Sequence, residues 1–201
     1  MIANVSPTES PMHSFSFVLI MSLAVSAPPS RLADIGPAPA TILVDSSGKL
    51  FDLASLKGKA VVVSFVYTTC SGACPATTLS LSRIQKTLQQ ARLWGISVQF
   101  VSISLDPDRD TIAVLTRYAQ LFHADLANWH FLTGSRSEVQ SVIAAWGMWA
   151  RTGPTGVLDH PSRIFLLDQE GRQREIYNLE FLKEDAVLED VQWLLSERSK
   201  K

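Results

Sequence analysis

Two stretches rich in apolar residues dominate the pattern of the chain. Residues 60–67 read AVVVSFVY and residues 96–105 read ISVQFVSISL. Both are rich in β-branched residues, which is typical of strands that are covered on both faces of a sheet. Shorter apolar or alternating runs predict further strands at 41–45, 49–53, 129–133, 163–168 and 172–177. Turn residues at 46–48 and 169–171 predict that two pairs of these strands form hairpins.

Four segments place apolar residues at helical spacing, at 75–95, 111–122, 135–147 and 183–197. Pro75 stands early in the first segment and Gly95 at its end, where helices favour these residues. Asp110 precedes the second segment and is predicted to cap it. Strands that alternate with helices, followed by a hairpin and a helix, predict an α/β domain with three layers, α/β/α, and a mixed central sheet. This order resembles a thioredoxin-like fold with an N-terminal β-hairpin extension.

An apolar run near the N-terminus predicts a targeting segment. Residues 15–27 are too few to span a bilayer comfortably, but their number is typical of the apolar part of a secretory signal. The run ends in the small residues expected before a cleavage site, although no Lys or Arg precedes it and Pro28 follows it. We therefore expect residues 1–27 to be a signal peptide or an uncleaved N-terminal anchor, with Met1 or Met12 as the first residue.

The residues after this segment divide into a linker and a domain. Residues 28–40 are rich in Pro and Ala and lack periodicity, which predicts a linker. Residues 41–198 contain all the predicted strands and helices and are expected to form one domain. A targeting segment of either kind predicts that this domain is periplasmic or is anchored to the outer face of the inner membrane.

Composition and charge exclude several classes of function. The 201 residues include 18 basic and 19 acidic side chains, and 46% of all residues are apolar. This hydrophobicity argues against a disordered chain. No basic cluster is present, so nothing in the charge pattern favours nucleic acid as a partner.

The only two cysteines, Cys70 and Cys74, follow the buried strand at 60–67 and precede Pro75. Loops in this position bind ligands in many open α/β sheets. A disulfide across three residues would close almost no loop, so structural stapling explains the pair poorly. The helix N-terminus is expected to favour the thiolate of Cys74, the form that binds metals and exchanges disulfides. The competing interpretation is a pair of small core residues or an inert bridge.

Four motifs resemble the Sco/SenC family, which consists of thioredoxin-like proteins that handle copper during the assembly of cytochrome c oxidase. By the order and spacing of these motifs, the resemblance covers about residues 36 to 196. The motifs are FVYTTCSGACP at 65–75, SLDPDRDT at 104–111, WHFLTG at 129–134, and Asp159-His160 followed by IFLLD at 164–168.

The resemblance implies that Cys70, Cys74 and His160 bind copper. Two thiolates suit Cu(I), and an added imidazole also suits Cu(II). The resemblance further implies that Asp106 lies near the metal loop and takes part in partner contact or redox tuning. Asp159 directly precedes His160 and is expected to orient His160 or a partner. Without the resemblance, His160 would be interpreted as a turn residue and Asp106 as part of a local turn. Of the other histidines, His13 lies in the predicted targeting segment, and His123 and His130 are expected in ordinary surface or core roles.

The function that we favour from the sequence is a copper chaperone. It would receive one copper ion, with an upstream copper donor as a further partner, and pass it to a copper-binding subunit of a terminal oxidase. The alternative is a thiol-disulfide oxidoreductase that reduces the cysteines of a target copper site, with Cys70 as the attacking thiol. A separate thiol-disulfide reductant would then be a partner that restores the two thiols. A His160–Pro161 bond in the cis form would match the cis-proline of thioredoxin-like oxidoreductases. A peroxidase is disfavoured, because the residues around Cys70 are not at the offsets that such enzymes require.

Overall fold

The computed structural model of the chain describes Met1, residues 31–153 and residues 157–198. Apart from Met1, the predicted leader lies outside the described residues, as does the first part of the predicted linker. In the part of the chain that is described, no helix is both long and apolar enough to cross a membrane.

The central sheet is mixed and has eight strands in the order β1-β10-β9-β4-β5-β6-β2-β3. β4, β5 and β6 run parallel to one another, and β9 and β2 flank them in the antiparallel direction. The strands are β1 Gly36–Pro37, β2 Ile42–Asp45, β3 Leu50–Asp52, β4 Ala60–Val66, β5 Val98–Ser104, β6 Trp129–Thr133, β9 Ile164–Leu167 and β10 Arg172–Tyr177. A separate pair, β7 Arg151–Thr152 and β8 Leu158–Asp159, forms a small hairpin.

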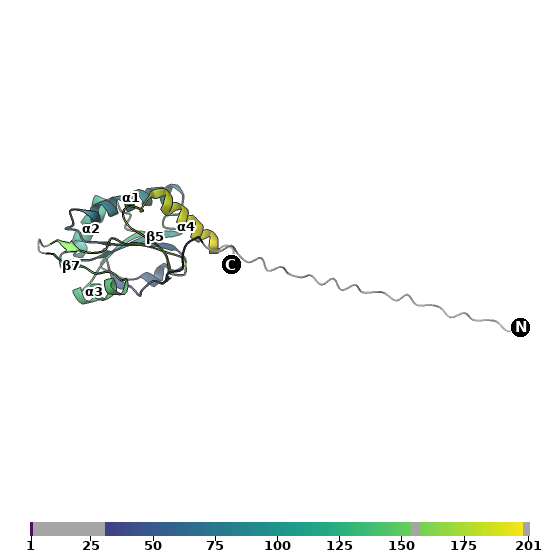
Figure 1. Cartoon of the computed structure of the whole chain (residues 1–201), viewed down its shortest axis with the longest axis horizontal. Helices are drawn as coiled ribbons and strands as arrows, with labels where there is room; N and C mark the ends of the chain where they lie inside the picture. Colours follow the sequence, from purple (N-terminus) through teal and green to yellow (C-terminus); the bar gives the residue numbers. More distant parts are fainter. Residues whose placement is uncertain (2–30, 154–156, 199–201) are drawn as a thin grey trace.

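Helices cover both faces of this sheet, which confirms the predicted α/β/α layers (Figure 1). α1 Ala73–Gln90, α2 Ile112–Leu121 and α4 Glu184–Arg198 lie on one face, and α3 Arg136–Ala145 lies on the other. Every residue of β4 and β5 is buried as a result, as their apolar sequences predict. Because β4, β5 and β6 are parallel, the loops that follow them all leave the sheet at the same end.

Two local predictions about the helices were wrong. The helix predicted at 75–95 begins at Ala73 and ends at Gln90, and Gly95, with φ of 74°, lies in the turn that leads into β5. Asp110 does not cap α2, because the hydroxyl of Thr111 accepts the hydrogen bond from the amide of Val114 instead. Asp110 is fully buried and has a different set of partners, described below.

The second part of the predicted linker, residues 31–40, packs against the domain. β1 pairs with β10, and Leu32 is buried. Arg31 forms an ion pair with Asp190 of α4 and lies over the ring of Trp193. The folded domain therefore includes residues that precede the first predicted strand.

Candidate functional site

The two cysteines lie at the end of the sheet where β4, β5 and β6 terminate. Cys70 is in the turn that follows β4, and its amide donates to the carbonyl of Tyr67 at 3.2 Å. Cys74 is the second residue of α1, whose N-cap is Gly72. Both are free thiols, but Cys70 is partly exposed whereas Cys74 is 2% exposed.

His160 reaches the cysteines from a distant part of the sequence. It follows β8 and precedes β9, which begins at the same end of the sheet because it is antiparallel to β4. Its Nε2 lies 3.8 Å from the Sγ of Cys74. Its Nδ1 lies 2.9 Å from the carbonyl oxygen of Pro161, which can only accept a hydrogen bond. The proton of a neutral ring therefore sits on Nδ1, and the lone pair of Nε2 faces Cys74.

Tyr67, the residue after β4, joins the cysteine loop to the segment that carries His160. Its hydroxyl donates to the carbonyl of Leu158 in β8 at 3.2 Å. Its ring meets the ring of His160 edge to face, with 5.6 Å between centroids. Among the described residues, the bond to Leu158 is the hydrogen bond that ties β8 to the central sheet. The sequence analysis assigned no role to Tyr67, although an aromatic residue directly before a cysteine loop was a signal for one.

The two thiols differ in acidity. Burial raises the pKa of Cys74 to about 12, and the hydrogen bond from the amide of Tyr67 offsets only part of this effect. Burial also raises the pKa of Cys70, but hydrogen bonds from the amides of Cys74 and Gly72 help to hold that pKa below its usual value. The expectation that the helix N-terminus favours the thiolate of Cys74 was therefore wrong, because desolvation outweighs the helix dipole and Cys70 is the more acidic thiol.

The acidic segment after β5 is hydrogen-bonded to the start of the cysteine loop through Asp110. The buried carboxylate of Asp110 accepts hydrogen bonds from the amide and hydroxyl of Thr68, at 3.1 and 2.6 Å, and from the hydroxyl of Ser104 at 2.7 Å. It thereby connects the start of the loop with the end of β5. Asp106 is 8% exposed and pairs with Arg109, and it lines a separate hollow beside α3.

Asp159 is exposed, and its backbone pairs with Arg151 in the β7–β8 hairpin. No hydrogen bond between the described residues joins its carboxylate to His160, whose Nδ1 is held by Pro161 instead. The described residues also contain no cis peptide bond, so the bond between His160 and Pro161 is trans and does not match the cis-proline considered for the oxidoreductase alternative.

A hollow of about 280 Å³ opens to the surface at the site. Tyr67, Cys70, Asp159 and His160 are among its lining residues. In the described chain, no three His, Cys, Asp or Glu side chains are already arranged around one point as a metal site. The other histidines lie elsewhere: His130 bonds to Gln99 on β5, and His123 follows α2. The geometry therefore places Cys70 and His160 on one hollow, with the buried Cys74 next to His160. A local adjustment of the loop is needed to complete any three-ligand site.

Comparison with protein families gives one match over most of the chain. The SCO1/SenC family matches residues 40–196. The SCO1 protein homolog of Bacillus subtilis is 30% identical over 151 residues, which are 73% of this chain and 77% of the relative. The mitochondrial SCO2 homolog of Bos taurus is 30% identical over 141 residues, which are 68% of this chain and 52% of the relative.

Solved structures give a consistent result. A SCO1/SenC family lipoprotein from Bacillus anthracis superposes with a TM-score of 0.74 at 27% identity, over 82% of this chain and 98% of that one. ScoI of Bradyrhizobium japonicum, solved with copper bound, has a TM-score of 0.68 at 28% identity, over 78% of this chain and 99% of that one. BsSco, described with a disulfide switch as a member of the Sco family of cytochrome c oxidase assembly proteins, has a TM-score of 0.71 at 25% identity, over 82% of this chain and 98% of that one.

Proposed function

The chain belongs to the SCO1/SenC family, and from this premise we propose that it is a copper chaperone. It binds one copper ion through Cys70, Cys74 and His160 and delivers the ion to a copper site of a respiratory oxidase. The role in copper handling is supported by the copper-bound structure of a relative, and the oxidase as destination by the description of BsSco. The partner that receives the ion is a copper-binding subunit of a terminal oxidase.

The observation that carries this proposal is the approach of His160 to Cys74. The 3.8 Å between Nε2 and Sγ joins residues that are 86 positions apart in the sequence, and Nε2 presents a lone pair there. The two sulfurs are soft donors that suit Cu(I), and the imidazole suits both Cu(I) and Cu(II). Rotation of the partly exposed Cys70 side chain toward Cys74 and His160 completes the set of three ligands, while α1 and β8 hold Cys74 and His160 in place.

Copper binding displaces protons, because thiols ligate metals as thiolates. Cys70, with its lowered pKa, ionises first and can capture the ion from solvent or from a donor. Cys74 holds its proton up to a pKa of about 12 and ionises when the metal replaces that proton. A three-coordinate ion beneath an open hollow can accept a thiolate from the target before the chaperone releases its own ligands, which favours transfer over storage.

Copper titration of single-residue variants tests the ligand set. We expect one copper per chain in the parent, loss of tight binding in Cys70→Ser and Cys74→Ser, and a retained but weaker Cu(I) site in His160→Ala with most Cu(II) binding lost. His123→Asn is the matched control, since this exposed histidine lies after α2 and away from the hollow. Parent-like binding of both oxidation states by His160→Ala would show that the ligand assignment is wrong.

The second candidate function is reduction of a target disulfide, and the difference between the two thiols favours it. The Cys70 thiolate attacks one sulfur of the target disulfide, forms a mixed disulfide and releases the first target thiolate. Cys74, after giving up its proton, attacks the Sγ of Cys70 and releases the second target thiolate. The target gains two electrons, a Cys70–Cys74 disulfide remains, and an external dithiol must reduce that disulfide before the next cycle.

Single cysteine variants also test this second function. With a disulfide-bonded peptide of an oxidase copper site as the substrate, Cys74→Ser is expected to accumulate a mixed disulfide through Cys70, whereas Cys70→Ser is expected to be inert. A parent that binds copper tightly but leaves the peptide oxidised would exclude the reductase. A parent that reduces the peptide and binds no copper would exclude the chaperone.

We also propose that the domain works outside the cytoplasm, in the periplasm or anchored to the outer face of the inner membrane. The predicted targeting segment supports this location, as does the likeness to a lipoprotein of the same family. Fractionation of cells that express the full-length chain tests it, and recovery in the cytosol would contradict it.

A further inference from the structure

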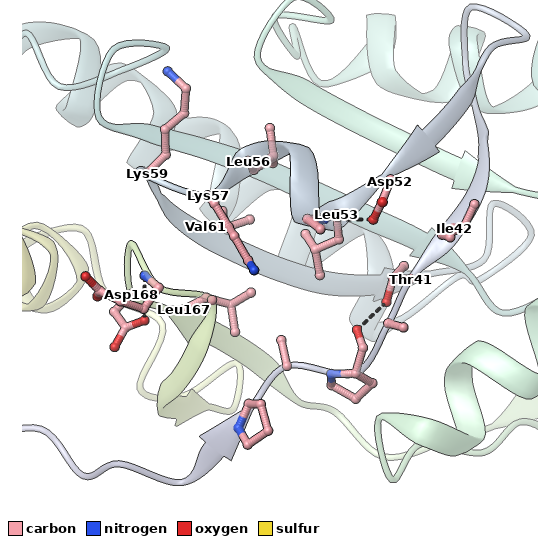
Figure 2. Close-up of a pocket in the computed structure, with 17 residues that line it drawn as sticks. Thr41, Ile42, Asp52, Leu53, Leu56, Lys57, Lys59, Val61, Leu167 and Asp168 are labelled. Carbon is pink, nitrogen blue, oxygen red and sulfur yellow. Dashed lines mark hydrogen bonds between the residues drawn. The ribbon is translucent and has the colours of Figure 1, made fainter.

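A second cavity, of about 330 Å³, lies at the end of the sheet opposite to the cysteines (Figure 2). Its floor is the cross-strand pair of Val61, near the start of β4, and Leu167, at the end of β9. Both side chains are at most 3% exposed. Leu53 and Leu56 of the 3-10 helix η1 Leu53–Leu56 form another apolar wall. The volume lies at the lower end of the range for ligand pockets, which is about 300 to 1,000 Å³.

Backbone hydrogen bonds close the walls into a ring. The walls are residues 37–42, residues 52–59 and residues 167–171. Residues 37–42 are bonded to residues 167–171, because the amide of Ala38 donates to the carbonyl of Gly171 at 2.9 Å. They are also bonded to residues 52–59, because the amide of Leu53 donates to the carbonyl of Thr41 at 2.9 Å. Residues 52–59 and 167–171 are joined by the amide of Gly58 and the carbonyl of Gln169 at 2.8 Å. The cavity is therefore formed before any ligand arrives.

The floor of the cavity is apolar, and over it lies the ammonium group of Lys57, which has no partner among the described residues. Figure 2 shows the Lys57 side chain extending from the end of η1 over the cavity. Among the described residues, no hydrogen bond or ion pair engages its ammonium group, whereas Lys59 donates to the carbonyls of Gly95 and Ile96 at 2.6 and 2.7 Å.

The acidic residues of the lining do not neutralise this cation. Asp168 is held by Arg174 and by the amides of Glu170 and Arg172. Asp52 accepts from the amide of Ala54 as the cap of η1. Glu170 is exposed at the rim and forms no ion pair within 4.0 Å among the described side chains.

From this arrangement we infer that the cavity binds a small organic monocarboxylate. The apolar body of the ligand lies on Val61, Leu167 and Leu53, and its carboxylate pairs with the ammonium of Lys57. An alkyl carboxylate uses both features, because its apolar body removes the floor from water and its carboxylate forms a charge-assisted hydrogen bond with the exposed ammonium of Lys57. This site is independent of the proposed copper site, because it lies at the other end of β4.

NMR titration of the full-length chain with hexanoate tests the inference. We expect saturable shifts of the amides of Thr41, Leu53 and Leu167 with hexanoate and at least fivefold weaker binding of 1-hexanol. Lys57→Gln is expected to weaken hexanoate binding at least fivefold. Lys49→Gln, which removes an exposed lysine from the β2–β3 turn, is the matched control and should bind as the parent does.

Ala38→Leu supplies an independent check, since the larger side chain occupies part of the cavity and is expected to abolish the shifts. Hexanoate that gives no saturable shift in the parent would overturn the inference. Equal affinities of the parent and Lys57→Gln, or of hexanoate and 1-hexanol, would also overturn it. Copper binding enters none of these measurements, so their failure would leave the chaperone proposal unaffected.

Discussion

At the scale of single residues, the difference in environment between Cys70 and Cys74 shapes the chemistry of the site. The two thiols are four positions apart, but one faces the hollow and the other is enclosed by β4, α1 and His160. Burial therefore raises the pKa of Cys74, while local hydrogen bonds lower that of Cys70. The partly exposed thiol of Cys70 is available for disulfide exchange or ligand exchange, and the buried thiol of Cys74 is available to anchor a metal ion.

Alkylation kinetics test this difference. We expect iodoacetamide at pH 8 to modify Cys70 at least ten times faster than Cys74, because only the exposed thiol is both accessible and partly ionised. The rate at Cys70 should rise with pH and reach half of its maximum at a lower pH than the rate for a cysteine in an unstructured peptide. Mass spectrometry of Cys70→Ser and Cys74→Ser measures each thiol alone. Equal rates at the two thiols would contradict the structure.

The contacts of Tyr67 predict an effect on copper that depends on oxidation state. Tyr67→Phe keeps the ring on His160 but removes the hydrogen bond to Leu158. We expect the affinity for Cu(II), which depends on His160, to fall roughly tenfold, as is common when a group that orients a ligand is removed. The affinity for Cu(I) should change less than threefold, since both thiols remain.

Tyr177→Phe is the control for this prediction, because it removes a buried hydroxyl that donates to Asp190 on another side of the domain. It should leave both copper affinities and the visible Cu(II) spectrum unchanged. Parent-like Cu(II) affinity and spectrum in Tyr67→Phe would show that the hydroxyl does not position His160.

The sequence was more informative about the ligating residue types than about their supports. Cys70, Cys74 and His160 could be selected because few side chains bind copper and because the motifs resemble a known family. Tyr67 and Asp110 act through a carbonyl and a loop amide that are distant in sequence, so no spacing pattern identifies these partners. The relative acidity of the thiols also required the burial of Cys74, which depends on tertiary packing.

At the scale of elements, long patterns were reliable and short ones were not. The buried strands β4 and β5 follow directly from sequences rich in β-branched apolar residues, since both faces are covered. The β7–β8 hairpin has two residues in each strand and lies in a stretch where the sequence pattern predicted no strand. Its position depends on the packing of Tyr67 against it, and local sequence does not encode that contact.

The burial of His130 on β6 predicts how stability changes with pH. Burial lowers the pKa of His130, and the nearby Asp45 offsets this only in part. Below the unfolded pKa of about 6.5, the unfolded chain binds more protons at this position than the folded chain does. The free energy of unfolding should therefore fall as pH decreases from about 6.5 toward the folded pKa.

Urea unfolding of His130→Gln and the parent between pH 5 and 7.5 measures this effect. The variant should be less sensitive to acid than the parent. His123→Asn is the control, because asparagine tolerates the positive φ of 54° at that exposed position, and it should keep the pH dependence of the parent. Identical slopes for the parent and His130→Gln would refute the prediction.

At the scale of the whole molecule, the site and the N-terminal attachment lie on different parts of the domain. The β7–β8 hairpin and the C-terminal end of α4 are at opposite ends in Figure 1. Arg31, the first residue of the long described segment, is bound to α4 through Asp190. If the preceding residues anchor the chain, this arrangement lets the cysteine hollow face a partner.

Truncation tests whether residues 31–40 belong to the folded unit. A chain that begins at Thr41 loses the buried Leu32, the β1–β10 pairing and the Asp34–Arg172 ion pair. We expect it to be about 2 to 4 kcal/mol less stable in urea unfolding than a chain that begins at Arg31, mainly through lost apolar burial and backbone hydrogen bonds. Equal stability would mean that this segment only rests on the surface.

Copper K-edge X-ray absorption of the copper-loaded chain tests the central claim most directly, because it reports the atoms bound to the ion. The account predicts two sulfur ligands and one imidazole nitrogen in the parent, and loss of the imidazole scattering alone in His160→Ala. A parent spectrum with no sulfur ligand, or an imidazole signal that persists in His160→Ala, would contradict the assignment of Cys70, Cys74 and His160 as the copper site.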